Sequence, residues 1–178
     1  TLIANNNGAL GTAAGATTVA TGATLALQGG IATAEALTLT SDGVMGGGAL
    51  RNLSGNNTVT GVITLGATGA RINSDAGLLT LSGGNITGAT QSTTVGGTGN
   101  TAISKVIATT TGALAKDGAG TLTLSGANTY TGSTNINAGT LIAANANALG
   151  TAAGTATVES GATLNVNNVT LAESVITI

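Results

Sequence analysis

The 178-residue chain contains no cysteine, histidine, proline, tryptophan or phenylalanine, and its one aromatic residue is Tyr130. Without cysteine it can form neither a disulfide framework nor a thiolate metal site. Without histidine it has no Ser-His-Asp triad and no histidine-based acid–base chemistry. Any core must be built from Leu, Ile, Val and Ala in thin layers, because the aromatic side chains that supply much of the buried area in most cores are missing.

Charged residues are also scarce, at 6% of the chain, and the formal net charge is -2. The four basic residues, Arg51, Arg71, Lys105 and Lys116, are scattered along the sequence. We therefore predict no nucleic-acid partner, which would require clustered positive charge. The apolar runs are short and broken by Gly and Thr, so we predict no membrane-spanning segment. Disorder is not expected either, because it comes from low hydrophobicity with high net charge, and 42% of these residues are hydrophobic.

What the sequence does contain is a repeated alternation of apolar and polar residues, closed by Gly, Asn or Ser. Leu122 and Leu124 alternate with threonines, and the same pattern recurs at Leu37–Leu39 and Leu79–Leu81. Alternation with period 2 over a few residues is typical of short, half-buried strands. Many of the 30 glycines lie between these runs, where they allow the positive φ angles of abrupt turns.

The beginning and the end of the chain are copies of each other. Thr1–Leu25 aligns without gaps with Thr140–Leu164, an offset of 139, and the two copies extend over residues 1–29 and 140–168. The N-terminus lacks the charged and apolar regions of a signal peptide. We therefore expect residues 1–178 to form a single segment of a longer repeat array.

Looser repeats lie beyond and between these copies. Ala34-Glu35 matches Ala172-Glu173 when one deletion is allowed. The segments that begin at Leu53, Leu81 and Leu124 also resemble one another, with leucine offsets of 28 and 43. We interpret these offsets as one turn and two turns of a stacked unit of about 20 to 28 residues.

Short strands joined by tight corners in repeated units predict a parallel β-helix of roughly seven coils, each about 4.8 Å above the last. Inward Leu, Ile, Val and Ala would form apolar ladders, and Asn and Thr would hydrogen-bond to their copies above and below. An antiparallel sandwich or barrel also uses alternating strands and is the rival prediction. The repeats and the missing aromatic residues favour stacking.

The segment Gly120–Leu141, GTLTLSGANTYTGSTNINAGTL, resembles the passenger-associated transport repeat of bacterial autotransporters. Gly46–Gly66 and Asn147–Val166 resemble the flanking parts of the same arrays. This resemblance implies a right-handed parallel β-helix in a secreted or surface-displayed passenger region. It also implies that the repeat helps the passenger to be exported and to fold, while activity resides in other domains.

Candidate catalytic residues are few. The acidic residues are Glu35, Asp42, Asp75, Asp117, Glu159 and Glu173. A β-helix polysaccharide lyase or glycosidase needs two or three carboxylates gathered on one face, often with Arg or Lys. Asp42, Asp75 and Asp117 could line one corner of the helix, but Asp beside Gly is more often a solubilising turn residue, and we favour that interpretation.

Binding motifs are similarly weak. Gly96–Thr101 resembles a GGxGxD calcium repeat with Thr101 in the Asp position, and we interpret it as a glycine-rich corner. Gly46–Gly48 lacks the Lys and Ser/Thr of a phosphate loop and is expected to be a bend. Tyr130 could stack on a sugar ring, although a lone tyrosine in a strand more often packs against a neighbouring coil. Asn-x-Ser/Thr triplets, which we attribute to chance, begin at Asn52, Asn56, Asn85 and Asn168.

We therefore predict a non-catalytic stalk or spacer of a bacterial secreted or cell-surface protein, with no catalytic, cofactor-binding or metal-binding residues. Its partners would be neighbouring repeats of the same chain. The alternative is an adhesive or self-associating module that binds a surface glycan or a second copy, because low-charge faces and unpaired coil ends do little to prevent contact. A polysaccharide-active enzyme is the third and least favoured hypothesis.

Overall fold

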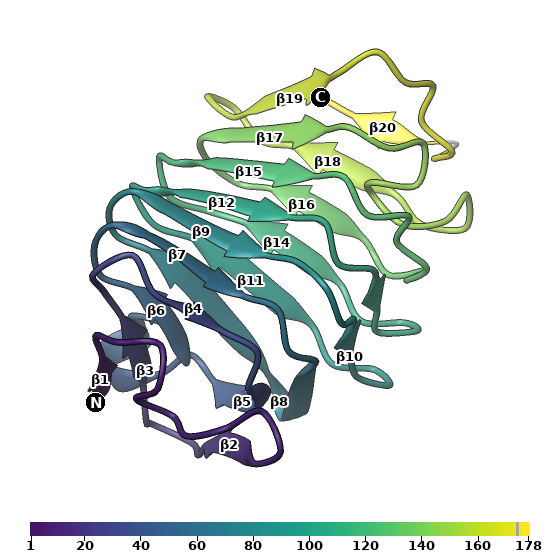
Figure 1. Ribbon diagram of the computed structural model, residues 1–178. Coiled ribbons are helices and arrows are strands. Elements are labelled where there is room, and N and C mark those ends of the chain that lie inside the picture. The colour runs from purple at the N-terminus through teal and green to yellow at the C-terminus, as the bar shows by residue number, and fades with distance from the viewer. Residues whose placement is uncertain (174) are drawn as a thin grey trace.

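The computed structural model describes residues 1–173 and 175–178, and it shows parallel strands wound into a solenoid of about eight turns (Figure 1). Strand pairing is parallel throughout the described chain, so the predicted parallel β-helix is confirmed and the antiparallel sandwich or barrel is excluded. The roughly seven coils expected from the sequence are close to the observed number. Apart from one short 3-10 turn, η1 (Val44–Gly46), the described elements are all strands.

Each full coil crosses three faces, which we call A, B and C in the order in which the chain meets them. Face A carries β1 (Leu2–Ala4), β3 (Leu25–Leu27), β6 (Leu50–Asn52), the end of β8 (Ile63–Ser74), β11 (Thr93–Gly96), β14 (Leu114–Lys116), β16 (Thr134–Ile136), β18 (Ala156–Val158) and β20 (Ile176–Thr177). Face B carries β4 (Ala32–Thr33), β7 (Asn56–Val59), β9 (Leu78–Leu81), β12 (Asn100–Ile103), β15 (Thr121–Leu124), β17 (Thr140–Ala143) and β19 (Thr163–Val166). Face C carries β2 (Ala16–Val19), β5 (Ala36–Ser41), the beginning of β8, β10 (Ile86–Thr87) and β13 (Ile107–Ala108).

The length of a coil varies with its corners. Stacked partners are 19 residues apart between Thr123 and Ile142 and 26 apart between Ala32 and Thr58. The predicted two-turn offset of 43 is confirmed, because Leu81 stacks under Ile103 and Ile103 under Leu124. The one-turn offset of 28 is wrong. Val59, and not Leu53, lies under Leu81, because Leu53 belongs to the corner between β6 and β7.

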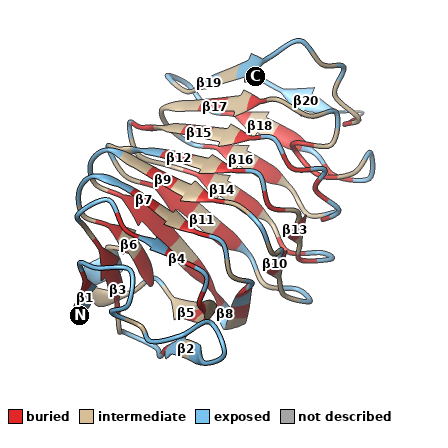
Figure 2. Cartoon of the chain, in the orientation of Figure 1, coloured by how far each residue is buried: buried red, intermediate tan, exposed pale blue. Residues whose placement is uncertain are grey.

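The interior is filled by ladders of aliphatic side chains. Figure 2 shows buried residues, in red, along parts of the strands from β6 to β18. On face A the inward ladder runs Leu25, Leu50, Ile72, Val95, Lys116, Ile136, Val158. On face B a second ladder runs Leu79, Thr101, Leu122, Leu141, Leu164. A single coil buries none of these side chains by itself, so each coil depends on its neighbours for its core.

Glycine closes the corner between faces A and B. Gly97 and Gly118 occupy stacked positions there with φ angles of 103° and 70°, in the region that side chains other than glycine rarely adopt. A Cβ atom at Gly118 would lie 2.5 Å from the backbone nitrogen of Gly97. The predicted role of glycine at the corners therefore holds here for two reasons, backbone angle and close stacking.

Polar ladders are less regular than predicted. Thr64 and Thr87 do hydrogen-bond to each other across coils, with 3.4 Å between their Oγ1 atoms. Asn128, however, bonds to backbone: its Oδ1 accepts from Ile107 N at 2.8 Å, and its Nδ2 donates to Ala148 O at 2.6 Å. One asparagine thus ties the coil below to the coil above where face C has no strand.

Candidate functional site

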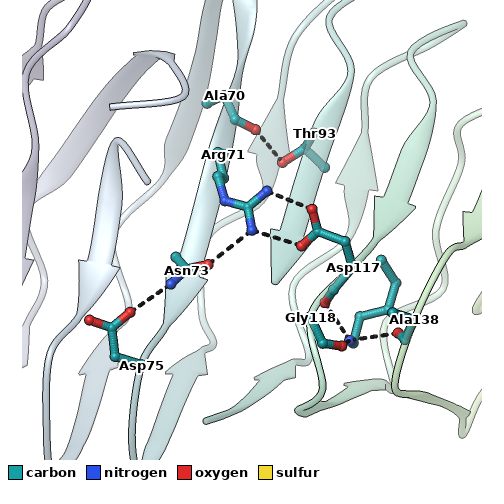
Figure 3. Close-up of polar contacts among 9 residues, drawn as sticks. Ala70, Arg71, Asn73, Asp75, Thr93, Asp117, Gly118 and Ala138 are labelled. Atoms are coloured by element: carbon teal, nitrogen blue, oxygen red, sulfur yellow. Dashed lines mark hydrogen bonds and ion pairs between the residues drawn. The ribbon is translucent and has the colours of Figure 1, made fainter. Parts of the chain in front are cut away.

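A strip of charged and polar side chains crosses the outside of face A. We call it the charged strip and define it as Arg51, Arg71, Asn73, Asp75 and Asp117. Arg71 donates to both carboxylate oxygens of Asp117 at 2.7 Å and to Asn73 Oδ1 at 3.1 Å (Figure 3). Asn73 Nδ2 donates to Asp75 Oδ1 at 2.7 Å, and Arg51 Nε donates to Asp75 Oδ2 at 2.8 Å. The network connects side chains from three levels of the stack, those of β6, β8 and β14, across the intervening level of β11.

The Arg71–Asp117 pair spans the coil that lies between its two members. Arg71 is on β8 and Asp117 follows β14, while β11 runs between them with Gly96 at the crossing point. A Cβ atom at Gly96 would overlap Asp117 Oδ1 and lie 2.5 Å from Arg71 Nη2. The missing side chain at Gly96 therefore makes room for the bidentate ion pair. The hydrogen bond to Asp117 raises the pKa of Arg71, so the guanidinium stays charged.

The sequence grouped Asp42, Asp75 and Asp117 as possible corner carboxylates. The structure brings Asp75 and Asp117 to the same side of the solenoid, but each is engaged by its own arginine. Asp42 lies on the exposed loop before η1, close enough to Arg71 to raise its pKa further. Both oxygens of Asp117 accept from Arg71, and the two oxygens of Asp75 accept from Arg51 and Asn73, so the hydrogen bonds of the strip already engage every carboxylate oxygen of the pair. Glu159, the exposed acid at the corner after β18, follows Val158 two coils above Asp117.

Sequence reasoning missed that Lys105 is inside the solenoid. Its side chain is 1% exposed, and Nζ donates to Gly61 O at 2.6 Å, Gly84 O at 2.7 Å and Thr60 O at 3.3 Å. Burial lowers the pKa of Lys105 to about 8. A signal was present in the sequence, because Lys105 continues the inward alternation of Ile103 and Ile107.

Lys116 repeats this arrangement at another corner. It occupies an inward position of the face A ladder, is 2% exposed, and extends to the corner between faces A and B. Nζ donates to Asp117 O at 2.6 Å, Gly118 O at 2.8 Å and Ala138 O at 3.1 Å. Burial lowers its pKa, and the nearby charge of Asp117 opposes this. The ammonium groups of both lysines thus donate hydrogen bonds to backbone carbonyl oxygens that converge from successive coils.

Tyr130 is fully buried, with its hydroxyl 2.6 Å from Thr134 Oγ1, which in turn donates to Leu149 O at 2.9 Å. Burial raises the pKa of its phenol. The expected packing against a neighbouring coil is therefore observed. Stacking of Tyr130 on a sugar is not possible in this structure, because no part of the ring reaches the surface.

Two acidic side chains are buried near the ends of the stack. Glu35 Oε1 accepts from Thr17 Oγ1 at 3.2 Å, and its Oε2 has no hydrogen-bond partner in the described residues. Both carboxylate oxygens of Glu173 also lack a partner there. Burial raises the pKa of Glu173. The two glutamates lie in different end regions and form no pair.

The remaining glycine motifs lie at a corner and a bend of the solenoid. Gly96–Thr101 forms a corner in which Thr101 points inward and is 3% exposed, and Gly46–Gly48 belongs to the bend around η1. Among the triplet asparagines, Asn52 is buried, and Asn56, Asn85 and Asn168 are exposed. In residues 1–173 and 175–178 no three His, Cys, Asp or Glu side chains gather as a metal site would require. Nor does that part of the chain hold a helix with the length and apolar character needed to cross a membrane.

The family model of the passenger-associated-transport-repeat matches residues 114–143. Comparison with curated proteins and with solved structures gives no match. The matched residues begin with β14 and run through β15 and β16 to β17, which is one coil of the solenoid and about half of the next. They include Asn128, Tyr130 and Lys116, whose contacts tie together adjacent coils. This stretch is therefore similar to the passenger-associated-transport-repeat, as the resemblance of Gly120–Leu141 predicted.

Proposed function

We propose that the chain is a non-catalytic spacer in the passenger region of an exported bacterial protein of the autotransporter type. The observation that carries this proposal is the position of the repeat-like residues 114–143 within an unbroken stack of coils. At about 4.8 Å per coil, the stack forms a column roughly 35 to 40 Å long. Such a column holds whatever precedes it at a fixed distance from whatever follows it.

The same architecture supports a role in export. Each coil completes its core only when the next coil stacks on it, so folding can proceed one coil at a time. A chain that emerges from the cell and folds in this order loses free energy with each coil added outside. Backward movement then requires unfolding, and net transport is biased outward. The segment would act on the cell surface or in the extracellular medium.

Replacing the passenger helix of a host autotransporter with residues 1–178 tests this proposal. An epitope at the exported end is quantified on intact cells by antibody binding and by sensitivity to external protease. We expect display of the wild-type segment and strongly reduced display of Leu122→Asp, because Leu122 is fully buried and an unpaired carboxylate there opposes stacking. Thr123→Asp is the matched control, since the next residue of the same strand points outward.

The control should be displayed as well as the wild type. Equal display of Leu122→Asp, with circular dichroism of the purified variant showing that it is unfolded, would refute the coupling of folding to export. Failure of the folded wild-type segment to be displayed would refute the passenger assignment itself.

A further inference from the structure

Two contacts near the middle of the stack connect coils that are not neighbours. We number the coils by their face A strands, so that β6, the end of β8, β11 and β14 begin coils 3, 4, 5 and 6. Strand pairing joins each of these coils to the next one. The two contacts reach one coil further, and we call them the inner bridge and the outer bridge.

The inner bridge is made by Lys105, which follows β12 in coil 5. Its Nζ donates to Gly84 O in coil 4 at 2.7 Å, and to Gly61 O at 2.6 Å and Thr60 O at 3.3 Å in coil 3. Lys105 is buried, so these bonds are shielded from water. Hydrogen bonds from a charged donor are also stronger than those between neutral groups. The inner bridge therefore holds coil 5 to coil 3 across coil 4.

The outer bridge is the ion pair between Arg71 in coil 4 and Asp117 in coil 6 (Figure 3). Arg71 donates to both carboxylate oxygens at 2.7 Å. Gly96 of coil 5 lies at the crossing point and leaves the space that the pair occupies. The two side chains are partly exposed, so solvent screens the outer bridge more than the inner one. The outer bridge holds coil 6 to coil 4 across coil 5.

The two bridges overlap along the stack. In a stack held only by contacts between nearest neighbours, the boundary between folded and unfolded coils can fall at any level at a similar cost. Here a boundary between coils 3 and 4 breaks the inner bridge, and one between coils 5 and 6 breaks the outer bridge. A boundary between coils 4 and 5 breaks both. Only a stack that contains all four coils keeps both bridges.

We propose that coils 3 to 6 form one cooperative unit that opens and closes as a whole. Coils on either side, which have no such bridge among the described residues, open one at a time. The bridges enclose the 58 residues from Thr60 to Asp117. A column with such a unit resists unravelling from either end until the whole unit opens. This device goes beyond the spacer function and does not depend on it.

Pulling on the two ends of single molecules in an optical trap tests the unit. An extended chain spans about 3.4 Å per residue, so opening all 58 residues together should release about 200 Å of chain. A single coil, with 19 to 26 residues between stacked partners, should release only about 60–90 Å. We expect the wild type to show one long step of about 200 Å besides the short steps of the outer coils.

Each bridge can be removed separately. Arg71→Met removes the outer bridge and leaves a unit from Thr60 to Lys105, so the long step should shorten to about 160 Å. Lys105→Met removes the inner bridge and leaves a unit from Arg71 to Asp117, with a step of similar length. The double variant should unravel only in steps of single coils.

Arg51→Met is the matched control. It also removes an arginine–aspartate ion pair from the outside of face A, but Arg51 and its partner Asp75 belong to the adjacent coils 3 and 4. Because this pair skips no coil, the long step should keep its full length. Circular dichroism establishes that each variant is folded.

A wild type that unravels only in steps of single coils would overturn the proposal. So would a double variant that keeps the full long step, or an Arg51→Met variant that shortens it as much as Arg71→Met does. If Lys105→Met does not fold, the comparison of Arg71→Met with Arg51→Met decides the proposal by itself.

Discussion

Residues 2–27 and 141–166 share nearly the same sequence and the same strand pairing, yet they lie on different faces of the solenoid. Leu2 stacks under Leu25 on face A, and Leu141 stacks under Leu164 on face B. The next strands of the two copies also pair in the same way. Thr17 stacks under Leu37 in the first copy, and Ala156 and Ile176, the residues 139 positions later, stack in the second. The local sequence thus determines which residue stacks on which, but not the face on which this happens.

The rotation comes from the length of chain between the copies. From Leu2, six steps along the face A ladder reach Ile136, and Leu141 follows on the next face. The 139 residues therefore span six coils and one additional face. An array with this spacing presents equivalent side chains on successive faces.

The copies also differ in surroundings. Leu141 is fully buried between coils, whereas its counterpart Leu2 is 56% exposed at the end of the stack. In the other half of the repeat the order is reversed: Leu27 is fully buried, and its counterpart Val166 is 44% exposed. The same strand pairing therefore contributes a different free energy of stabilisation in each copy, because different members of the pairs are buried.

The largest effect is expected from truncating the same leucine in each copy. Leu141→Ala should lower the free energy of unfolding by about 2–5 kcal/mol, because it leaves a cavity between coils. Leu2→Ala should cost less than about 1 kcal/mol, since the side chain is already largely in water. Chemical denaturation at a concentration where both variants are monomeric measures the difference. Equal costs would show that the two environments are alike.

A smaller effect is expected in the coils between the copies. Gly96→Ala should cost about 2–3 kcal/mol, because the new methyl group separates Arg71 from Asp117. Hydrogen exchange should show loss of protection around β8, β11 and β14. Protection of the β1–β3 and β17–β19 pairs should change little. Uniform loss across all coils would mean that the charged strip stabilises the whole stack and not its central part.

The smallest effect concerns pH. Neither copy contains a lysine, and Lys105 lies between them with a pKa lowered to about 8. Because unfolded Lys105 keeps its proton until about pH 10.5, the unfolded state binds more protons than the folded state between pH 8 and 10.5. Wild-type stability should therefore rise with pH across this range, by about 1–2 kcal/mol more than in Lys105→Met. Parallel pH profiles for the two proteins would show that Lys105 does not contribute.

The sequence allowed the parallel solenoid, its half-buried strands and its glycine corners to be predicted. These depend on short-range alternation and on repeats, which are visible without coordinates. The prediction that Leu53 stacks one turn below Leu81 was wrong. The segment at Leu53 resembles those at Leu81 and Leu124, but Val59 occupies the stacked position. Similar motifs can begin at different points of a coil, because corners absorb different numbers of residues.

The candidate site was harder to predict. Tyr130 as a packing residue was foreseen, whereas Lys105 and Lys116 were noted only as two of four scattered basic residues, and both are buried. Their inward alternation with Ile103 and Leu114 was visible, but lysine is rarely buried without partners, and its partners here are carbonyls from other coils. The pairing of Arg71 with Asp117 also depends on stacking, since 46 residues separate them.

Composition and alternation by themselves determined that this chain stacks strand upon strand, because short strands with one apolar side and no large aromatic residues can bury that side only against their neighbours. Only the tertiary structure decided on which face each copy lies, which charges meet, and which lysines are enclosed. These outcomes depend on the summed length of all the coils between two residues, and a change at any one corner shifts every residue that follows.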